Sequence, residues 1–217
     1  MSVSRKSTKK RYTTEEISFN NLTGLHYKPP NSFPDLIPFS IENCSNATLL
    51  VLDTLAQCTV DESKNSFIFI GCCDGPIFIR DCHDSTIITA SKQLRLKNCH
   101  RLNLFIYCSS QPIIELSTEI QFSPFCFYYP ELLDQFEKLK MNVFNNFWNP
   151  IYDFSDSTGK NWTIGKDKLI EYPTTPQLDI LGIQLDQSSS IVPYTFGNLY
   201  QNHLNDFKKV RLMFFYQ

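Results

Sequence analysis

Residues 80–84 read Arg-Asp-Cys-His-Asp, and the pattern returns 17 residues later as Lys-Asn-Cys-His-Arg at residues 97–101. A related segment, Glu-Asn-Cys-Ser-Asn at residues 42–46, lies 38 residues before the first, or two steps of 19 with a degenerate segment near Lys64 and Asn65. Short apolar runs follow these polar segments. A period just under 20 residues with polar corners is typical of a solenoid, and we predict a parallel β-helix over about residues 39–122. A β-sandwich of short strands is the alternative fold.

The stretch between the two best repeats, residues 91–99, reads Ser-Lys-Gln-Leu-Arg-Leu-Lys-Asn-Cys. In an extended strand, residues two apart share one face. Gln93, Arg95 and Lys97 therefore point to one side, which we expect to be solvated, and Leu94 and Leu96 point to a buried side. Such a face suits either an ordinary exposed strand or an arginine finger, a cation that enters the phosphate site of a partner.

The eight cysteines contain no Cys-x-x-Cys pair and no zinc-like spacing, so we expect neither a metal site nor a disulfide framework. The polar start of the chain is unlike a secretory signal, which favours a reducing compartment and free thiols. Small Cys and Ser side chains would then fill an interior ladder at the corners of the β-helix.

We divide the chain into a polar arm and Pro-rich lead-in (1–37), a β-helix domain (38–165), and a linker with a final strand (166–217). Basic residues in the first 16 positions indicate either a flexible tail or an electrostatic arm for an acidic partner, such as a membrane surface. Residues 129–140 predict a short helix that caps the open end of the stack. Dense aromatic residues from 144 to 162 indicate either a loop anchored to the core or a recognition surface.

The bulk properties exclude several classes of function. A formal net charge of −2 over 217 residues is unlike a globally basic nucleic-acid-binding protein, and no run of about 18 apolar residues predicts a membrane span. Hydrophobic residues make up 42% of the chain, which is enough for a packed core. No carboxylate pair stands out on the repeats, which disfavours a polysaccharide-acting β-helix enzyme.

Several separated motifs occur in a characteristic order: Phe-Ile-Gly at 69–71, Gly-Pro-Ile-Phe-Ile-Arg-Asp-Cys at 75–82, Gln-Leu-Arg-Leu-Lys-Asn-Cys at 93–99 and Gln-Pro-Ile-Ile-Glu at 111–115. Segments at 122–124, 128–131, 145–148 and 153–154 continue the series. Together they resemble the tubulin-binding cofactor C family from about residue 18 to 215. Residues 173–175 and 190–193 look like the linker of one branch of that family.

The resemblance implies an all-β fold, a right-handed parallel β-helix with a short C-terminal helix and an irregular tail. It further implies a GTPase-activating protein, with tubulin as the partner in part of the family and a GTP-bound Arf-like small GTPase in this branch. Arg95 corresponds to the family's finger and Gln93 to the supporting Gln. Glu115 and Phe154 match partner-contact positions, and we add Lys92 and Lys97 as partner-binding candidates. Magnesium and GTP belong to the partner, so no cofactor is expected.

The chain departs from the family pattern at a few positions. This chain has Lys92 where the family often has a second Gln, and Lys97 where the family often has a second Arg. This branch of the family normally starts Met-Gly-Cys for dual acylation, whereas this chain starts Met-Ser-Val. We therefore expect no anchoring of that kind. We interpret residues 210–216 as the opening strand of an absent C-terminal domain. The expected location is cytoplasmic, at the cilium, basal body or microtubules, and a non-catalytic module that binds tubulin or a GTPase there is the alternative function.

Overall fold

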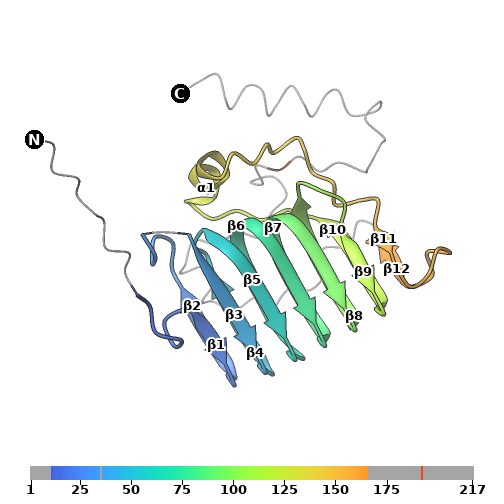
Figure 1. Ribbon diagram of the computed structural model, residues 1–217, viewed down its shortest axis with the longest axis horizontal. Coiled ribbons are helices and arrows are strands. Elements are labelled where there is room, and N and C mark those ends of the chain that lie inside the picture. Colours follow the sequence, from blue (N-terminus) through green and yellow to red (C-terminus); the bar gives the residue numbers. More distant parts are fainter. Residues whose placement is uncertain (1–10, 35, 166–191, 193–217) are drawn as a thin grey trace, which may run out of the picture.

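The computed structural model describes residues 11–34, 36–165 and 192, and it confirms a parallel β-helix. Every strand pair in these residues is parallel. Strands of successive coils stack side by side along the long axis of the molecule (Figure 1). Asp74 and Gly75 form an irregular step inside one long strand, where the register shifts, and not a hairpin turn.

The strands form two sides of the β-helix. The first side contains β2 (Gly24–Lys28), β4 (Ala47–Val51), the first halves of β6 (Phe67–Arg80) and β7 (His83–Lys97), β8 (His100–Cys108), β10 (Thr118–Pro124) and β12 (Trp162–Ile164). The second side contains β1 (Ser18–Asn20), β3 (Ile37–Glu42), β5 (Leu55–Asp61), the second halves of β6 and β7, β9 (Ile113–Glu115) and β11 (Tyr152–Asp153).

The two sides differ in how they meet solvent, and the sequence pattern explains the difference. The central strands of the first side are nearly continuous apolar runs, as in residues 67–73, because both of their faces are buried. Strands of the second side alternate, as in residues 93–97, because only their inner face packs into the core. The outer face of the second side is therefore the open one.

The corners between coils share one backbone pattern. Two residues with positive φ are separated by two others in successive coils: Asn43 and Asn46, Glu62 and Asn65, Asp81 and Asp84, Asn98 and Arg101, and Leu116 and Glu119. Asn and Asp adopt this left-handed conformation more readily than most residues, which explains the polar corners of the sequence repeat. The degenerate corner expected near Lys64 and Asn65 is confirmed.

Small side chains form the expected ladder inside these corners. Its buried members are Cys44, Ser63, Cys82, Cys99 and Ser117. The Ser117 hydroxyl accepts a hydrogen bond from the backbone N–H of Cys99 at 3.0 Å. All eight cysteines are buried and free, and burial raises the pKa of the Cys82 thiol to about 12. The thiols therefore act as small apolar groups and not as nucleophiles.

The helix α1 (Leu132–Lys138) corrects one expectation. It does not cap the end of the stack; it covers the flank of the central coils, on the outer face of the first side (Figure 1). Phe136 packs against Tyr107 of β8 with ring centroids 4.9 Å apart, and the Gln135 amide donates to the Leu52 carbonyl at 2.6 Å. The apolar outer faces of β4, β6, β7 and β8 are buried beneath this helix and the segment that leads to it.

The N-terminal boundary of the β-helix domain is a second correction. We placed it at residue 38, yet β1 and β2 already form a coil that pairs with β3 and β4. The corner of this coil has positive φ at Asn21 and Gly24, so it follows the same backbone rule with a less polar sequence. Within the described residues, no helix has the length and apolar character to cross a bilayer. The expected strand at 210–216 lies outside the described residues, as does almost all of the linker.

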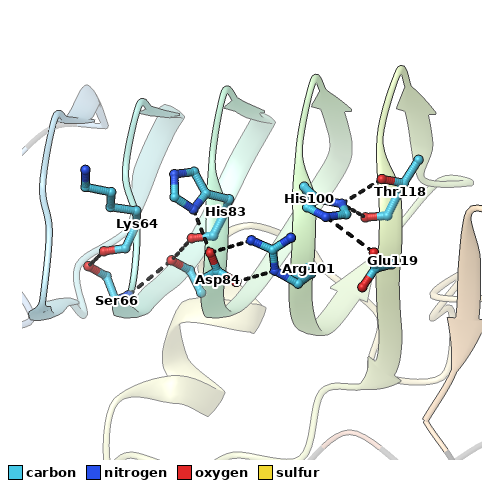
Figure 2. A network of polar contacts seen from close by, with 9 residues as sticks. Lys64, Ser66, His83, Asp84, His100, Arg101, Thr118 and Glu119 are labelled. Carbon is cyan, nitrogen blue, oxygen red and sulfur yellow. Dashed lines mark hydrogen bonds and ion pairs between the residues drawn. The ribbon is translucent and has the colours of Figure 1, made fainter.

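Ion pairs and hydrogen bonds connect the corners of neighbouring coils (Figure 2). Arg101 binds the Asp84 carboxylate with two guanidinium nitrogens, one of them at 2.8 Å, and His83 contacts the same carboxylate at 2.8 Å. One coil further, His100 contacts the Thr118 hydroxyl at 2.7 Å and Glu119 at 3.3 Å. Arg101 and then His83 hold the pKa of the Asp84 carboxyl well below its ordinary range.

This lowered pKa predicts an acid-sensitive contribution to stability. A carboxyl with a depressed folded-state pKa stabilises the fold above its unfolded pKa, near 4, and that contribution is lost as the pH falls through the folded value. We expect Arg101→Gln to lower the thermal midpoint at pH 7 slightly and to flatten its decrease between about pH 4 and pH 2. The measurement is thermal unfolding followed by circular dichroism across this range.

The matched control is Lys64→Gln, which removes one positive charge from the same row of corners. Within the described part of the chain, the Lys64 side chain makes no ion pair. The thermal midpoint of Lys64→Gln should therefore decrease between about pH 4 and pH 2 as steeply as that of the unmodified protein. If the thermal midpoints of Arg101→Gln and the unmodified protein decreased equally steeply with falling pH, the Arg101–Asp84 pair would not be the source of the acid sensitivity.

Candidate functional site

The second half of β7 presents the predicted polar face. Gln93, Arg95 and Lys97 are exposed, while Leu94 and Leu96 are almost fully buried in the core. The expected alternation is therefore confirmed. The surrounding strands on both sides, β6 and β9, hold β7 by parallel pairing, so these three side chains project from a rigid sheet.

Arg95 occupies the centre of this face, and no described residue pairs with its guanidinium. It lies level with Phe78 on β6 and Ile113 on β9, both of which are half-buried. Among the residues that the structure describes, Arg95 makes no hydrogen bond and no ion pair. Two other arginines behave differently: Arg80 binds Asp61 at 2.6 and 2.7 Å, and Arg101 binds Asp84.

A row of charged residues runs beside Arg95, two residues further along each strand. In register across the sheet it contains Asp61, Arg80, Lys97 and Glu115. Arg80 pairs with Asp61 at one end, which raises the pKa of the guanidinium, and Lys97 pairs with Glu115 at 3.1 Å at the other. Both carboxylates therefore carry their own cation.

Lys92 lies at the edge of the face and is turned toward Asp74, with which it forms an ion pair. Its backbone carbonyl accepts a hydrogen bond from the Ser110 hydroxyl at 2.8 Å. Beside it, Gly75 allows a close approach of β6 to β5, because a Cβ there would lie 2.3 Å from the Ala56 carbonyl oxygen. The Lys92–Asp74 pair therefore connects β7 to β6 at the point where their register shifts.

Aromatic side chains border the same face on the last coil. Phe154, 64% exposed, stacks edge-on against Tyr152 with ring centroids 4.8 Å apart, and Tyr152 is level with Ile113. The Phe154 backbone N–H donates to the Ile114 carbonyl at 2.9 Å, which places it beside Glu115. Leu116, 61% exposed, lies next to Glu115, and its backbone N–H donates a hydrogen bond to the Ser155 hydroxyl oxygen.

The fold thus brings five of the six predicted residues to one exposed face, with Lys92 at its edge. Sequence reasoning missed Phe78, Ile113, Tyr152 and Leu116. Tyr152 lies two residues before Phe154, and that spacing was the signal that places both rings on one side of a strand.

In the described part of the chain, no group of three His, Cys, Asp or Glu side chains is placed to hold a metal ion. Within the described residues, what the face offers chemically is a guanidinium without a polar partner, flanked by Phe78 and Ile113 on the neighbouring strands.

Comparison with known proteins agrees with this architecture. The family model of tubulin binding cofactor C matches residues 37–154. The chain is 36% identical to Protein XRP2 of Xenopus laevis over 184 residues, which is 81% of this chain and 52% of that protein. The chain belongs to the tubulin binding cofactor C family. The expected family is thereby confirmed.

The chain also matches members of the tubulin binding cofactor C family at lower identity. The human tubulin-specific chaperone C is 27% identical over 124 residues, which is 55% of this chain and 36% of that protein. The solved structure of tubulin binding cofactor C from Leishmania major superposes with a TM-score of 0.50 at 19% identity and covers 57% of this chain and 86% of that one. This likeness supports the fold. The chain spans about half the length of XRP2.

Proposed function

We propose that this protein stimulates GTP hydrolysis by an Arf-like small GTPase, with Arg95 acting as a finger in trans. The observation that carries the proposal is that Arg95, on an exposed face of a strand paired on both sides, has no polar partner among the residues that the structure describes. A cation that must enter another protein's phosphate site has to be free of internal partners, and it has to be held in a fixed direction. The similarity to XRP2, which is greater than that to the tubulin chaperone, supports a GTPase of this class as the partner.

In this mechanism Arg95 neutralises the charge that develops on the transferred phosphoryl group. Gln93, two residues away on the same face, supports Arg95 or the partner's catalytic residue. Phe154 and Glu115 contact the partner beside the nucleotide site, with Lys97 and Lys92 in supporting positions. The partner supplies GTP and magnesium, so the chain needs no cofactor of its own. We place this activity in the cytoplasm at the cilium, in the trafficking of lipidated cargo.

A second function fits one specific observation. The chain is also similar to tubulin-specific chaperone C. In addition, position 92, where the family often has Gln, is a Lys that forms an ion pair with Asp74. A non-catalytic module that binds tubulin or a GTPase as a structural part of the cilium or of microtubules would keep the exposed face without using Arg95 in hydrolysis.

Binding to different nucleotide states separates the two functions. A catalyst binds the transition state more tightly than the ground state, so we expect the chain to bind the GTPase most tightly when it holds GDP with a planar phosphate mimic. Binding should be weaker to the GTP-loaded form and weakest to the GDP-loaded form. The measurement is calorimetric titration of a panel of Arf-like GTPases, with tubulin dimer as a further partner. Equal affinity for the three nucleotide states would favour the structural module.

A further inference from the structure

Three carboxylates on or beside the face that carries Arg95 are occupied by other cations. Asp61 is held by Arg80, Asp74 by Lys92, and Glu115 by Lys97, whereas Arg95 has no such partner in the described residues. These three ion pairs, beside a guanidinium without a polar partner in the described residues, form an arrangement that the proposed function does not by itself require. It indicates that the neighbouring cations have a role in keeping Arg95 free.

Glu115 is the carboxylate on a neighbouring strand that competes most directly for Arg95. Arg95 is level with Ile113, and Glu115 lies two residues further along β9 on the same face. Diagonal neighbours of this kind are about 7–8 Å apart, within reach of long side chains. Lys97 is directly level with Glu115 and holds its carboxylate at 3.1 Å. Side chains that are directly level form an ion pair more easily than diagonal ones, so Glu115 pairs with Lys97 and not with Arg95.

We propose that Lys97 is a positioning residue: by occupying Glu115, it prevents the carboxylate from capturing Arg95. Its effect on hydrolysis rests on the proposed function, but its effect on the Arg95 side chain exists in the free protein. An exposed Arg–Glu pair forms with an equilibrium constant of about 1.4 to 5. Losing Lys97 would therefore leave Arg95 captured for more than half of the time. The stimulated rate would fall by about two- to six-fold, and less at high salt.

The test is a set of four proteins: the unmodified chain, Lys97→Met, Glu115→Gln and the double variant. Lys97 and Glu115 are both substantially exposed, at 55% and 44% of their side-chain surface, so these changes leave the core intact. The first measurement is NMR of the Arg95 Nε–H group in the free protein. The signal that disappears in Arg95→Lys is assigned to Arg95. We expect slower guanidinium rotation and slower hydrogen exchange in Lys97→Met alone. The double variant should match the unmodified protein.

The second measurement is single-turnover GTP hydrolysis at saturating activator. Lys97→Met should lower the stimulated rate two- to six-fold relative to the unmodified protein. In the Glu115→Gln background, the same change should cause no further loss beyond that of Glu115→Gln alone. An equal loss in both backgrounds means that Lys97 contacts the GTPase itself, and it would overturn the inference. An NMR signal unaffected by Lys97→Met overturns it as well. Failure of the proposed function looks different, since Arg95→Ala would then leave the stimulation unchanged whatever the NMR result.

Discussion

Replacing Arg95 with Ala should lower the stimulated rate of GTP hydrolysis by about 10³- to 10⁵-fold, which corresponds to about 4–7 kcal/mol of lost transition-state stabilisation. The loss is large because the guanidinium acts on charge that appears only in the transition state. Binding to the GTP-loaded GTPase should change much less. The measurement is single-turnover hydrolysis at saturating activator, with binding measured separately by calorimetry.

The folding of the Arg95→Ala variant should be unaffected. Arg95 has no polar partner in the described part of the chain, so the free energy of unfolding should stay within about 0.5 kcal/mol of the original value. Arg80→Ala is the matched control, because Arg80 lies on the next strand of the same face but is tied to Asp61. It should retain the rate within a few-fold. Unchanged stimulation by Arg95→Ala would remove the finger mechanism.

Phe69→Ala should have the largest effect on stability, about 3–5 kcal/mol of unfolding free energy. Phe69 is fully buried on the outer face of β6, where its ring meets Phe125, Phe127 and Tyr129 at centroid distances of 6.2, 5.6 and 5.7 Å. Its removal leaves a cavity between the β-helix and the segment that carries α1. Urea unfolding followed by tryptophan fluorescence measures the change.

Phe154→Ala is the matched control for Phe69→Ala, since it makes the same substitution at an exposed position. It should change the unfolding free energy by less than about 0.5 kcal/mol and should instead weaken binding of the GTPase. Similar destabilisation by both variants would contradict the packing of the flank. A Phe154→Ala variant with unchanged GTPase affinity would remove Phe154 from the proposed interface.

Local patterns predicted the parts of the site that depend on one strand. The alternation from Gln93 to Lys97 predicted which side chains face solvent, and the polar corners predicted the coils, including the degenerate one near Lys64. The boundary at residue 38 was wrong because the corner at Asn21 and Gly24 keeps the backbone rule of the other corners while its residues look different. The helix position was wrong because the sequence shows an apolar stripe but not the surface that the stripe covers.

The sequence by itself determined that the chain coils, where most of its corners lie, and that Arg95 points outward, because each of these follows from the local periodicity of a few residues. Only the tertiary structure decided which charges meet. Whether Lys97 takes Glu115, or Arg80 takes Asp61, depends on the register between strands 18 or 19 residues apart, as does the meeting of Tyr152 with Ile113 across a longer gap. That register is set by the packing of whole coils on a common core, and it leaves Arg95 as the cation whose neighbouring carboxylates are already taken.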